Sequence, residues 1–371
     1  MRNIKQIKNL KGTKVLLRVD FNVPIKDGEV EDNFRIRKAL PTIKYLKQKG
    51  AKIILITHLG KGGDSLLPVA TALQKLIKSK FVANLFGLEA EIAIKAMKNG
   101  DILLLENLRN DKGEQACDQF FASNLAKLGD VYVNDSFSVD HRADASIVLL
   151  PRLLPRYAGF QLEEEIKHLS SAFKKPKHPF TFILGGAKFD TKMPLIEKYI
   201  RYADNVFIGG ALLNDFLKAK GYEVGTSLVS EDTFGIEKLI GNKKIILPED
   251  VLVKVGDEFI YKNVTDIEHG DFIIDVGTKS IKNISATIQK SKLILWNGPL
   301  GDYEIGGDQA TKKMLKLVAK SKAFSIIGGG DTLEIISEMK MEKKFSFVST
   351  GGGATLDFLA NGTLPGVKAL Q

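Results

Sequence analysis

The sequence predicts an α/β protein with mostly parallel sheets. Apolar runs of four to six residues, the length of a buried strand, recur along the whole chain. Segments in which apolar residues have helical spacing separate these runs, for example residues 36–50 and 309–320. The runs are continuously hydrophobic, as in strands that helices cover on both faces. Alternation of such strands with helices is the pattern of an α/β fold.

Ten segments are predicted as buried strands. They are residues 14–19, 52–57, 101–105, 130–133, 180–184, 205–208, 244–247, 292–296, 323–327 and 345–348. Amphipathic helices are expected between them, with clear patterns at residues 114–128 and 332–339. Pro151 and Pro155 interrupt the pattern before a charged helix at residues 161–175. We therefore expect a domain boundary near residues 151–175.

Length and composition favour a globular protein with two domains. The 371 residues exceed one ordinary hydrophobic core, and 44% of them are hydrophobic and 26% charged. No apolar run approaches the roughly 18 residues of a membrane span, and the N-terminus lacks the hydrophobic region of a signal peptide. A cytoplasmic location is therefore expected. The single cysteine, Cys117, cannot form an internal disulfide and is interpreted as a small core or surface residue.

The charge balance favours an anionic partner. The chain has 54 Lys+Arg against 44 Asp+Glu, which gives a net charge of +10. The basic residues are spread along the predicted helices without a dense block, and the aromatic-plus-basic strand motifs of single-strand binders are absent. We therefore expect a small anion as the partner in preference to nucleic acid.

Polar and charged residues follow the predicted strands of the first half, at the ends where parallel sheets bind ligands. They are Asp20, Asn22, His58, Lys61, Arg109, His141 and Arg142, and Arg35 opens the next helix. Several arginines on one surface form a receptor for a carboxylate and a phosphate, because the guanidinium fork matches their oxygens bidentately. Any one arginine is better explained by a surface ion pair, whereas the set together favours an anion receptor.

The second half places glycines at its strand ends. Residues 180–192 (FTFILGGAKFDTK) run from a strand through two glycines to Lys188 and Lys192, which share one face of the expected helix. The glycines of this segment are equally consistent with tight strand-to-helix packing. Further glycine turns lie at residues 209–210, 297–299, 328–332 and 351–353. Repeated turns of this kind suit a nucleotide, and Asp331 is interpreted as either a helix N-cap or a ligand of Mg²⁺.

Nine motifs, in chain order, resemble those of the 3-phosphoglycerate kinase family across essentially the whole chain. They are VLLRVDFNVP, DNFRIRKALPTIKYL, THLGK, LLENLR, VNDSFSVDHRADAS, ILGGAKFDTK, ILWNGPLGDYE, IIGGGDT and STGGGATLDFLANGTLPGVKAL. The resemblance implies two Rossmann-like domains joined by a hinge helix. The expected limits are residues 1–155 for a phosphoglycerate-binding domain, 156–175 for the hinge, 176–350 for a nucleotide-binding domain and 351–371 for a segment that returns to the first domain.

The resemblance also implies an activity. This is the reversible in-line transfer of the acyl phosphate of 1,3-bisphosphoglycerate to Mg-ADP, giving 3-phosphoglycerate and ATP, by a cytoplasmic, hinge-bending monomer of glycolysis or gluconeogenesis. Mg²⁺ is the expected cofactor, and no nucleic acid or membrane partner is expected. Two alternatives stay open: a related acyl-phosphate kinase with another carboxylate substrate, and a non-enzymatic nucleic-acid-binding protein.

Site residues carry over from the resemblance by motif. The implied substrate-binding residues are Asp20, Phe21, Asn22, Arg35, His58, Leu59, Gly60, Lys61, Arg109 and Arg142. The implied nucleotide-binding residues are Gly186, Lys188, Lys192, Gly210, Asn297, Pro299, Glu304, Gly329, Gly330, Asp331 and Thr332, with Asp331 holding the metal. Arg35, Lys192 and the glycines Gly351, Gly352 and Gly353 are the implied catalytic residues.

The chain departs from the family's usual pattern at three places. Lys61 stands where an arginine is common, which keeps the charge and loses the planar fork. Asp144 replaces a frequent histidine, which makes the basic surface less positive. Ala360 and Asn361 replace a frequent Glu-Gly pair, with an expected weakening of an interdomain contact.

Overall fold

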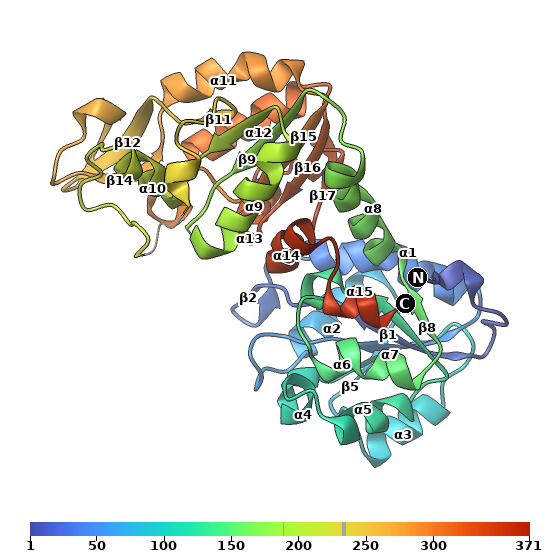
Figure 1. The fold of residues 1–371 in the computed structure, drawn as a ribbon. Coiled ribbons are helices and arrows are strands. Elements are labelled where there is room, and N and C mark those ends of the chain that lie inside the picture. Colours follow the sequence, from blue (N-terminus) through green and yellow to red (C-terminus); the bar gives the residue numbers. More distant parts are fainter. Residues whose placement is uncertain (188, 232–234) are drawn as a thin grey trace. The chain divides into compact units, whose positions relative to one another are not determined.

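The computed structural model of the chain describes residues 1–187, 189–231 and 235–371 (Figure 1). The chain folds into two compact units. The first unit comprises Met1–Lys167 and Asn361–Gln371, and the second comprises His168–Ala360. Each unit contains a six-stranded parallel sheet with helices between its strands, so the predicted α/β class is confirmed. Among the described residues, no helix combines the length and the apolar character that crossing a membrane requires.

The sheet of the first unit has the strand order β5-β6-β4-β1-β7-β8, and every neighbouring pair is parallel. Its strands are β1 (Lys14–Val19), β4 (Lys52–Ile56), β5 (Lys80–Val82), β6 (Ile102–Leu105), β7 (Val131–Asp135) and β8 (Arg156–Ala158). The central strands are buried almost throughout, because helices cover both faces of a parallel sheet. The sequence pattern missed β5 and β8, which have three residues each.

Helices of the first unit follow most of these strands, and a short hairpin precedes the first of them. The hairpin is β2 (Ile25–Lys26) with β3 (Glu29–Val30), and the helices are α1 (Phe34–Gln48), α2 (Leu67–Leu76), α3 (Leu88–Lys95), α4 (Lys112–Gln115), α5 (Gln119–Ala126), α6 (Ala145–Val148), α7 (Leu150–Leu153) and α15 (Pro365–Ala369). The apolar faces of α1 and α2 pack with β1, β4 and β6 into one core. α15, in red in Figure 1, contacts α6, so the end of the chain belongs to this unit.

Helix α8 (Phe160–Lys174) runs through the point at which the first unit gives way to the second. The sheet of the second unit has the order β11-β10-β9-β15-β16-β17 and is parallel throughout. Its strands are β9 (Phe180–Leu184), β10 (Asn205–Ile208), β11 (Ile245–Ile246), β15 (Leu293–Asn297), β16 (Phe324–Gly328) and β17 (Phe347–Val348). The helices are α9 (Phe189–Tyr202), α10 (Ala211–Ala219), α11 (Thr278–Lys290), α12 (Gln309–Lys320), α13 (Gly330–Glu338) and α14 (Gly353–Asn361).

A three-stranded antiparallel sheet in the second unit was not predicted. It has the order β13-β12-β14, with β12 (Asp250–Val255), β13 (Glu258–Asn263) and β14 (Phe272–Val276). The edge strand β13 is largely exposed, including Phe259 and Tyr261. Buried-strand patterning does not detect such a strand, because its apolar residues do not mark a core face.

One helix prediction is wrong in detail, and one of the two alternatives for Asp331 is excluded. The continuous helix expected over residues 114–128 is two helices, α4 and α5, because Cys117 between them adopts a left-handed conformation with φ of 53°. Asp118 then caps α5 by accepting a hydrogen bond from the amide of Phe121. Asp331 is not an N-cap, since α13 begins at Gly330 and its N-cap is Gly329.

Asp140, whose carboxyl group is buried, joins the end of the chain to the rest of the first unit. Asp140 is completely buried, and its Oδ1 accepts a hydrogen bond of 2.7 Å from Asn134 Nδ2. The amide of Gly366 in α15 donates to the carbonyl of Asp140 at 2.9 Å, and a Cβ at Gly366 would lie only 2.4 Å from Asp140 Oδ1. Burial raises the pKa of Asp140 to about 7.

Replacement of Asp140 by asparagine should stabilise the protein in a pH-dependent way. A carboxyl group whose pKa is higher in the folded state contributes fully to stability below its unfolded pKa of about 4, and this contribution is lost as the pH rises through 7. The free energy of unfolding of Asp140→Asn, relative to the parent, should therefore increase from pH 4 to pH 7, by up to about 4 kcal/mol. Urea unfolding at pH 5 and pH 8 measures the change. The exposed Asp27→Asn variant serves as the control, and a difference that is independent of pH would contradict the prediction.

Candidate functional site

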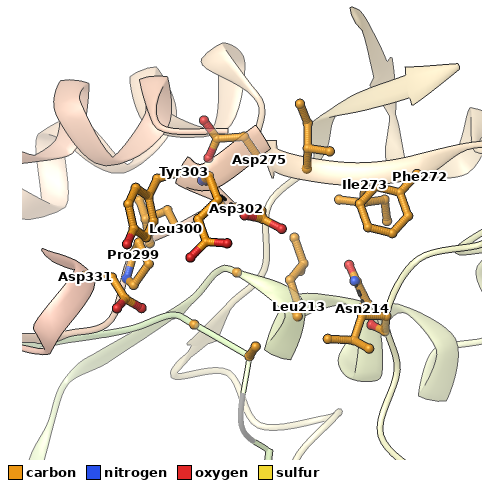
Figure 2. A pocket seen from close by; sticks show the side chains of 18 of the residues that line it. Leu213, Asn214, Phe272, Ile273, Asp275, Pro299, Leu300, Asp302, Tyr303 and Asp331 are labelled. Carbon is orange, nitrogen blue, oxygen red and sulfur yellow. Dashed lines mark hydrogen bonds between the residues drawn. The ribbon is translucent and has the colours of Figure 1, made fainter. Parts of the chain in front are cut away.

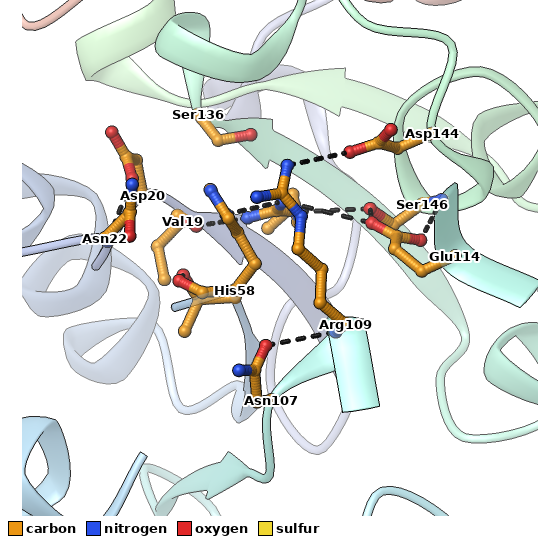
Figure 3. Close-up of polar contacts among 12 residues, drawn as sticks. Val19, Asp20, Asn22, His58, Asn107, Arg109, Glu114, Ser136, Asp144 and Ser146 are labelled. Atoms are coloured by element: carbon orange, nitrogen blue, oxygen red, sulfur yellow. Dashed lines mark hydrogen bonds and ion pairs between the residues drawn. The ribbon is translucent and has the colours of Figure 1, made fainter. Parts of the chain in front are cut away.

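The first candidate site lies at the carboxyl ends of four neighbouring strands of the first unit. Asp20 follows β1, His58 follows β4, and Arg109 lies in the 3-10 helix Leu108–Asn110 after β6. Ser138 lies in the 3-10 helix Phe137–Val139 after β7. Since β6, β4, β1 and β7 are adjacent in the sheet, their loops meet, as Figure 3 shows for Asp20, His58 and Arg109.

Asp20 is held among donors from three elements. Arg35 Nη1, in the first turn of α1, forms an ion pair with Asp20 Oδ2, and the hydroxyl of Ser138 donates to the same oxygen. The amide of Asn22 donates to Asp20 Oδ1 at 3.0 Å. Burial acts to raise the pKa of Asp20, but the charge of Arg35 and these hydrogen bonds outweigh it and hold the pKa below its usual value. Asp20 is therefore an ionised group that orients Arg35, whose side chain is 25% exposed.

A second chain of contacts links Asn22 to Arg109. The amide of Gly60 donates to Asn22 Oδ1 at 2.9 Å, and Arg109 Nη1 donates to the carbonyl of Gly60 at 2.6 Å. Gly60 has a φ of +59° and a Cβ there would lie 2.5 Å from Asp64 Oδ2, so a side chain does not fit. The loop after β4 thus joins the loops after β1 and β6.

His58 is fixed in one tautomer by a buried arginine that the sequence analysis did not single out. Arg18, within β1, is fully buried, and its Nη2 lies 3.2 Å from His58 Nδ1. A guanidinium group only donates, so Nδ1 is the acceptor and the proton of the neutral ring is on Nε2. Burial and the charge of Arg18 hold the pKa of His58 well below its usual value.

Glu114 balances the charge of Arg18. Its carboxylate is fully buried, lies 4.0 Å from Arg18 Nη2 and accepts a hydrogen bond of 2.6 Å from Ser146 Oγ. Arg18 Nε donates to the same hydroxyl at 3.0 Å (Figure 3). A buried charge must be paired, so an arginine inside the apolar run KVLLRV was the signal that could have revealed this network.

Of the other residues predicted for the substrate site, some have buried side chains and others have exposed ones. The side chains of Phe21 and Leu59 are buried in the hydrophobic core, so only their backbones border the site. Lys61 and Arg142 are exposed. Arg142 is close enough to lower the pKa values of both His58 and Arg109 by its charge.

The second candidate site is a cavity of about 360 Å³ in the second unit (Figure 2). Carboxylates of Asp302 and Asp331 and the ring of Tyr303 lie toward one end, and Leu213, Asn214, Phe272 and Ile273 toward the other. Of the predicted nucleotide-binding residues, Gly186, Gly210, Pro299, Glu304 and Asp331 line this cavity. The mostly apolar end suits a flat ring, and the carboxylates at the other end suit a cation that carries phosphates.

Some glycines of this unit border the cavity, and some allow neighbouring loops to pack closely. A Cβ at Gly185 would lie 2.0 Å from the carbonyl oxygen of Pro299, so this glycine is required for close contact between the loops after β9 and β15. Gly210 has a φ of +63°, and a Cβ there would lie 2.3 Å from the amide nitrogen of Gly186. The strand-end loops therefore approach one another backbone to backbone, and the amides of Gly186 and Gly210 donate to the carbonyls of Pro299 and Leu300 at 2.8 Å.

Lys192 belongs to this group of loops. Its side chain is only 6% exposed, and a Cβ at Gly186 would lie 2.3 Å from Lys192 Nζ. The ammonium group thus lies directly against the glycine turn that follows β9. Lys188 lies outside the described residues.

The remaining predicted residues surround the start of two helices. Asn297 is buried at the end of β15, and the side chain of Thr332, in the first turn of α13, is completely buried. Asp331 is exposed in the same turn, after Gly329 and Gly330. Gly351, Gly352 and Gly353 form the turn that opens α14.

A family model described as phosphoglycerate kinase matches residues 4–362. The chain belongs to the phosphoglycerate kinase family. It is accordingly a phosphotransferase with a carboxyl acceptor, and its function is that of a phosphoglycerate kinase. The comparisons give no support to another acyl-phosphate kinase or to a nucleic-acid-binding protein.

Relatives and solved structures agree with this family over their whole length. The chain is 44% identical to the phosphoglycerate kinase of Wolbachia sp. subsp. Drosophila simulans over 100% of this chain and 99% of the relative. It is 44% identical to that of Dictyoglomus turgidum over 98% of this chain and 96% of the relative. The structure of phosphoglycerate kinase from Coxiella burnetii matches with a TM-score of 0.84 and 34% identity over 99% and 98% of the two chains. That from Pyrococcus horikoshii OT3 matches with a TM-score of 0.89 and 31% identity over 100% and 98%.

Asp144, one departure from the usual pattern of phosphoglycerate kinases, has a structural role here. Its Oδ2 lies 3.5 Å from Arg109 Nη2, and both side chains are buried. Arg109 is thus held from two sides, by the carbonyl of Gly60 and by this carboxylate. Asp144 thus makes this surface less positive, and its carboxylate orients Arg109.

His58 should remain neutral, with its proton on Nε2, at the pH where a free histidine is half protonated. A lowered pKa means that the neutral form persists to lower pH than in a free histidine. Side-chain ¹⁵N chemical shifts, assigned with a His58→Gln variant, measure both the charge and the tautomer. A His58 signal that titrates with a midpoint near the ordinary value of about 6.5 would show that Arg18 does not control this ring.

Proposed function

We propose that the first unit binds 3-phosphoglycerate or 1,3-bisphosphoglycerate and that the second binds ADP or ATP with Mg²⁺. The observation that carries this proposal is Arg109. Its Nε is buried and donates no hydrogen bond to any described residue, and its buried Nη2 has only the ion pair with Asp144 at 3.5 Å. A buried cationic donor without an acceptor is costly, and a carboxylate or phosphate ligand would satisfy it.

The groups around Arg109 fit the two ends of phosphoglycerate. Asn22 and the Nε2–H of His58 offer neutral hydrogen bonds, and the exposed Arg142 adds a second guanidinium fork. Arg35 is partly exposed and is oriented by Asp20, so it can move toward the phosphoryl group that is transferred while Asp20 keeps two other donors. Lys61 contributes charge at the rim of this site.

The second unit is suited to a nucleotide. We propose that the base occupies the apolar end of the cavity near Leu213 and Phe272, and that the phosphates lie toward Lys192. The implied backbone contacts are the turns at residues 186, 210, 297–299 and 329–330. The glycine turn at residues 351–353 would lie against the transferred phosphoryl group and donate to it through the amides of Gly352 and Gly353, since the amide of Gly351 donates to Ser349 Oγ. Lys188 is proposed to contact the nucleotide on sequence grounds alone.

Asp331 fits Mg²⁺, because hard carboxylate oxygens suit this ion. Among the described residues, no group of three or more His, Cys, Asp or Glu side chains gathers to hold a metal. Mg²⁺ in kinases is usually held by one or two carboxylates together with substrate phosphates, so one exposed Asp331 at the polar end of the cavity suffices. The ion would neutralise phosphate charge when bound.

The chemistry requires positioning and charge neutralisation without a covalent intermediate. A β-phosphate oxygen of ADP attacks the phosphorus atom of the acyl phosphate, and the bond from phosphorus to the carboxyl oxygen breaks, which releases the carboxylate of 3-phosphoglycerate. The attacking oxygen is already anionic, so no base is needed in this direction. Arg35, Lys192 and the amides of the glycine turn are the proposed stabilising groups. We also propose that the enzyme is a cytoplasmic monomer of glycolysis or gluconeogenesis and works by hinge bending.

ADP formation from Mg-ATP on addition of 3-phosphoglycerate tests the function. Acetate is the control for another acyl-phosphate kinase, and 2-phosphoglycerate tests the geometry of the receptor, because it has the same groups in other positions. We expect turnover only with 3-phosphoglycerate and only with Mg²⁺. Equal turnover with acetate, or binding of DNA or RNA that weakens steeply with salt in place of turnover, would refute the proposal.

Arg35→Ala should lower kcat by about 10²-fold or more and leave the affinity for Mg-ADP unchanged, because the lost contact is proposed to act mainly on the transferred phosphoryl group. Asp20 keeps its hydrogen bonds to Ser138 and Asn22, so the fold should persist. Steady-state kinetics and the melting temperature measure both effects. The matched control is Arg37→Ala, an exposed arginine in the same helix, which should retain parental turnover. Parental kcat in Arg35→Ala, or an unfolded variant, would contradict this role.

A further inference from the structure

Lys198 in α9 makes a contact that the proposed chemistry does not yet use. Its ammonium group donates hydrogen bonds to the carbonyl oxygens of Leu359 at 2.6 Å and of Ala360 at 2.9 Å. Both carbonyls belong to the last turn of α14. Carbonyls at the end of a helix have no partner within the helix, and a cation there also interacts favourably with the helix dipole. Lys198 therefore caps the C-terminal end of α14.

An aromatic contact reinforces this cap. Lys198 Nζ lies 4.7 Å from the centre of the Phe173 ring in α8, and Phe173 packs against Phe358 of α14 with ring centres 6.0 Å apart. The side chain of Phe358 is almost completely buried. Helices α8, α9 and α14 thus meet around one ammonium group, and the residues that make these contacts all lie within the second unit.

The opposite end of α14 is the glycine turn at residues 351–353. The amide of Gly351 donates to Ser349 Oγ at 3.1 Å, and Ser349 Oγ lies 2.7 Å from Thr355 Oγ1. Ser349 is completely buried directly after β17. A helix of nine residues is about 13 Å long and moves as one rod, so a displacement of its C-terminal end also turns the glycine turn.

Helix α9 also carries Lys192, six residues before Lys198. One end of α9 thus presents the ammonium group that lies against Gly186, and Lys198 further along the same helix holds α14. The contact between Lys198 and α14 therefore fixes the distance between the Lys192 ammonium group and the amides of residues 351–353. Both of these are proposed to stabilise the same phosphoryl group.

We propose that Lys198 is a positioning residue for phosphoryl transfer, which keeps the glycine turn of α14 in register with Lys192. This inference rests on the proposed function. Lys198 itself does not contact the reacting atoms, and the nucleotide cavity does not include it. Loss of its ammonium group should therefore affect the rate of transfer more than nucleotide binding, since small misplacements of catalytic groups lower rates strongly.

The test compares Lys198→Met and Lys198→Arg with a matched control. Methionine keeps an apolar stem over Phe173 and removes the donors, whereas arginine keeps donors for two carbonyls. The control is Gln289→Met, because Gln289 Nε2 donates to the carbonyl of Leu317 in the last turn of α12 at 3.3 Å, the same kind of contact on a helix that carries neither Lys192 nor the glycine turn. The measurements are kcat, KM for both substrates and the melting temperature.

Lys198→Met should lower kcat by about tenfold or more, with the KM for Mg-ADP within about twofold of the parent. Lys198→Arg should recover most of the parental kcat. Gln289→Met should retain parental kcat, because its contact involves neither α9 nor α14.

The inference is overturned by parental kcat in Lys198→Met or by an equal loss of kcat in Gln289→Met. If Lys198→Met and the milder Lys198→Gln both unfold at the assay temperature, the role of Lys198 is in global stability and the inference is likewise wrong. Failure of the proposed function is a different result, namely no turnover of 3-phosphoglycerate and Mg-ATP by the parent protein.

Discussion

The site of the first unit depends on the contacts that the buried guanidinium group of Arg18 makes with Glu114, Ser146 and His58. A charged side chain in the middle of an apolar strand is costly unless it is paired, and here Glu114 and Ser146 pair it within the core. With its charge balanced on that side, Arg18 is free to donate to His58 on the other. The position and tautomer of His58 therefore derive from the interior of the protein, while Asp20 and Arg35 are set by the loops around it.

The two units prepare for anions by different means. The first unit uses side chains, with arginines whose forks are oriented by carboxylates such as Asp20 and Asp144. The second uses bare backbone, since its strand-end glycines approach within distances at which any Cβ would collide. In the proposed function, the side-chain forks recognise the shape of a small acid, whereas the glycine turns and the buried Lys192 accommodate a chain of phosphates.

The sequence predicted the parallel strands well because they are buried on both faces, so their apolar runs are unbroken. It failed where tertiary contacts decide the structure. The left-handed Cys117 divides a helix whose apolar spacing continues across the break, since α4 and α5 pack on the same side of the unit. The exposed strand β13 has no buried face to mark it.

The candidate sites could be located from the sequence only in part. Strand ends of a parallel sheet converge, so Asp20, His58 and Arg109 could be grouped from their positions after predicted strands. The partner of Arg18 could not be found in this way, because Ser146 lies 128 positions along the chain and no local pattern joins the two.

The fixed tautomer of His58 has a consequence for the substrate's own ionisation. Because burial and the charge of Arg18 hold the pKa of His58 well below its usual value, this ring stays neutral where an ordinary histidine would titrate, and its contribution to the charge of the site does not change there. A phosphate monoester loses its second proton with a pKa of about 6, in the same region. In the complex proposed above, His58 therefore contributes nothing to a change in affinity with pH in this region, whereas ionisation of the ligand and of Asp140, whose pKa is about 7, would both contribute.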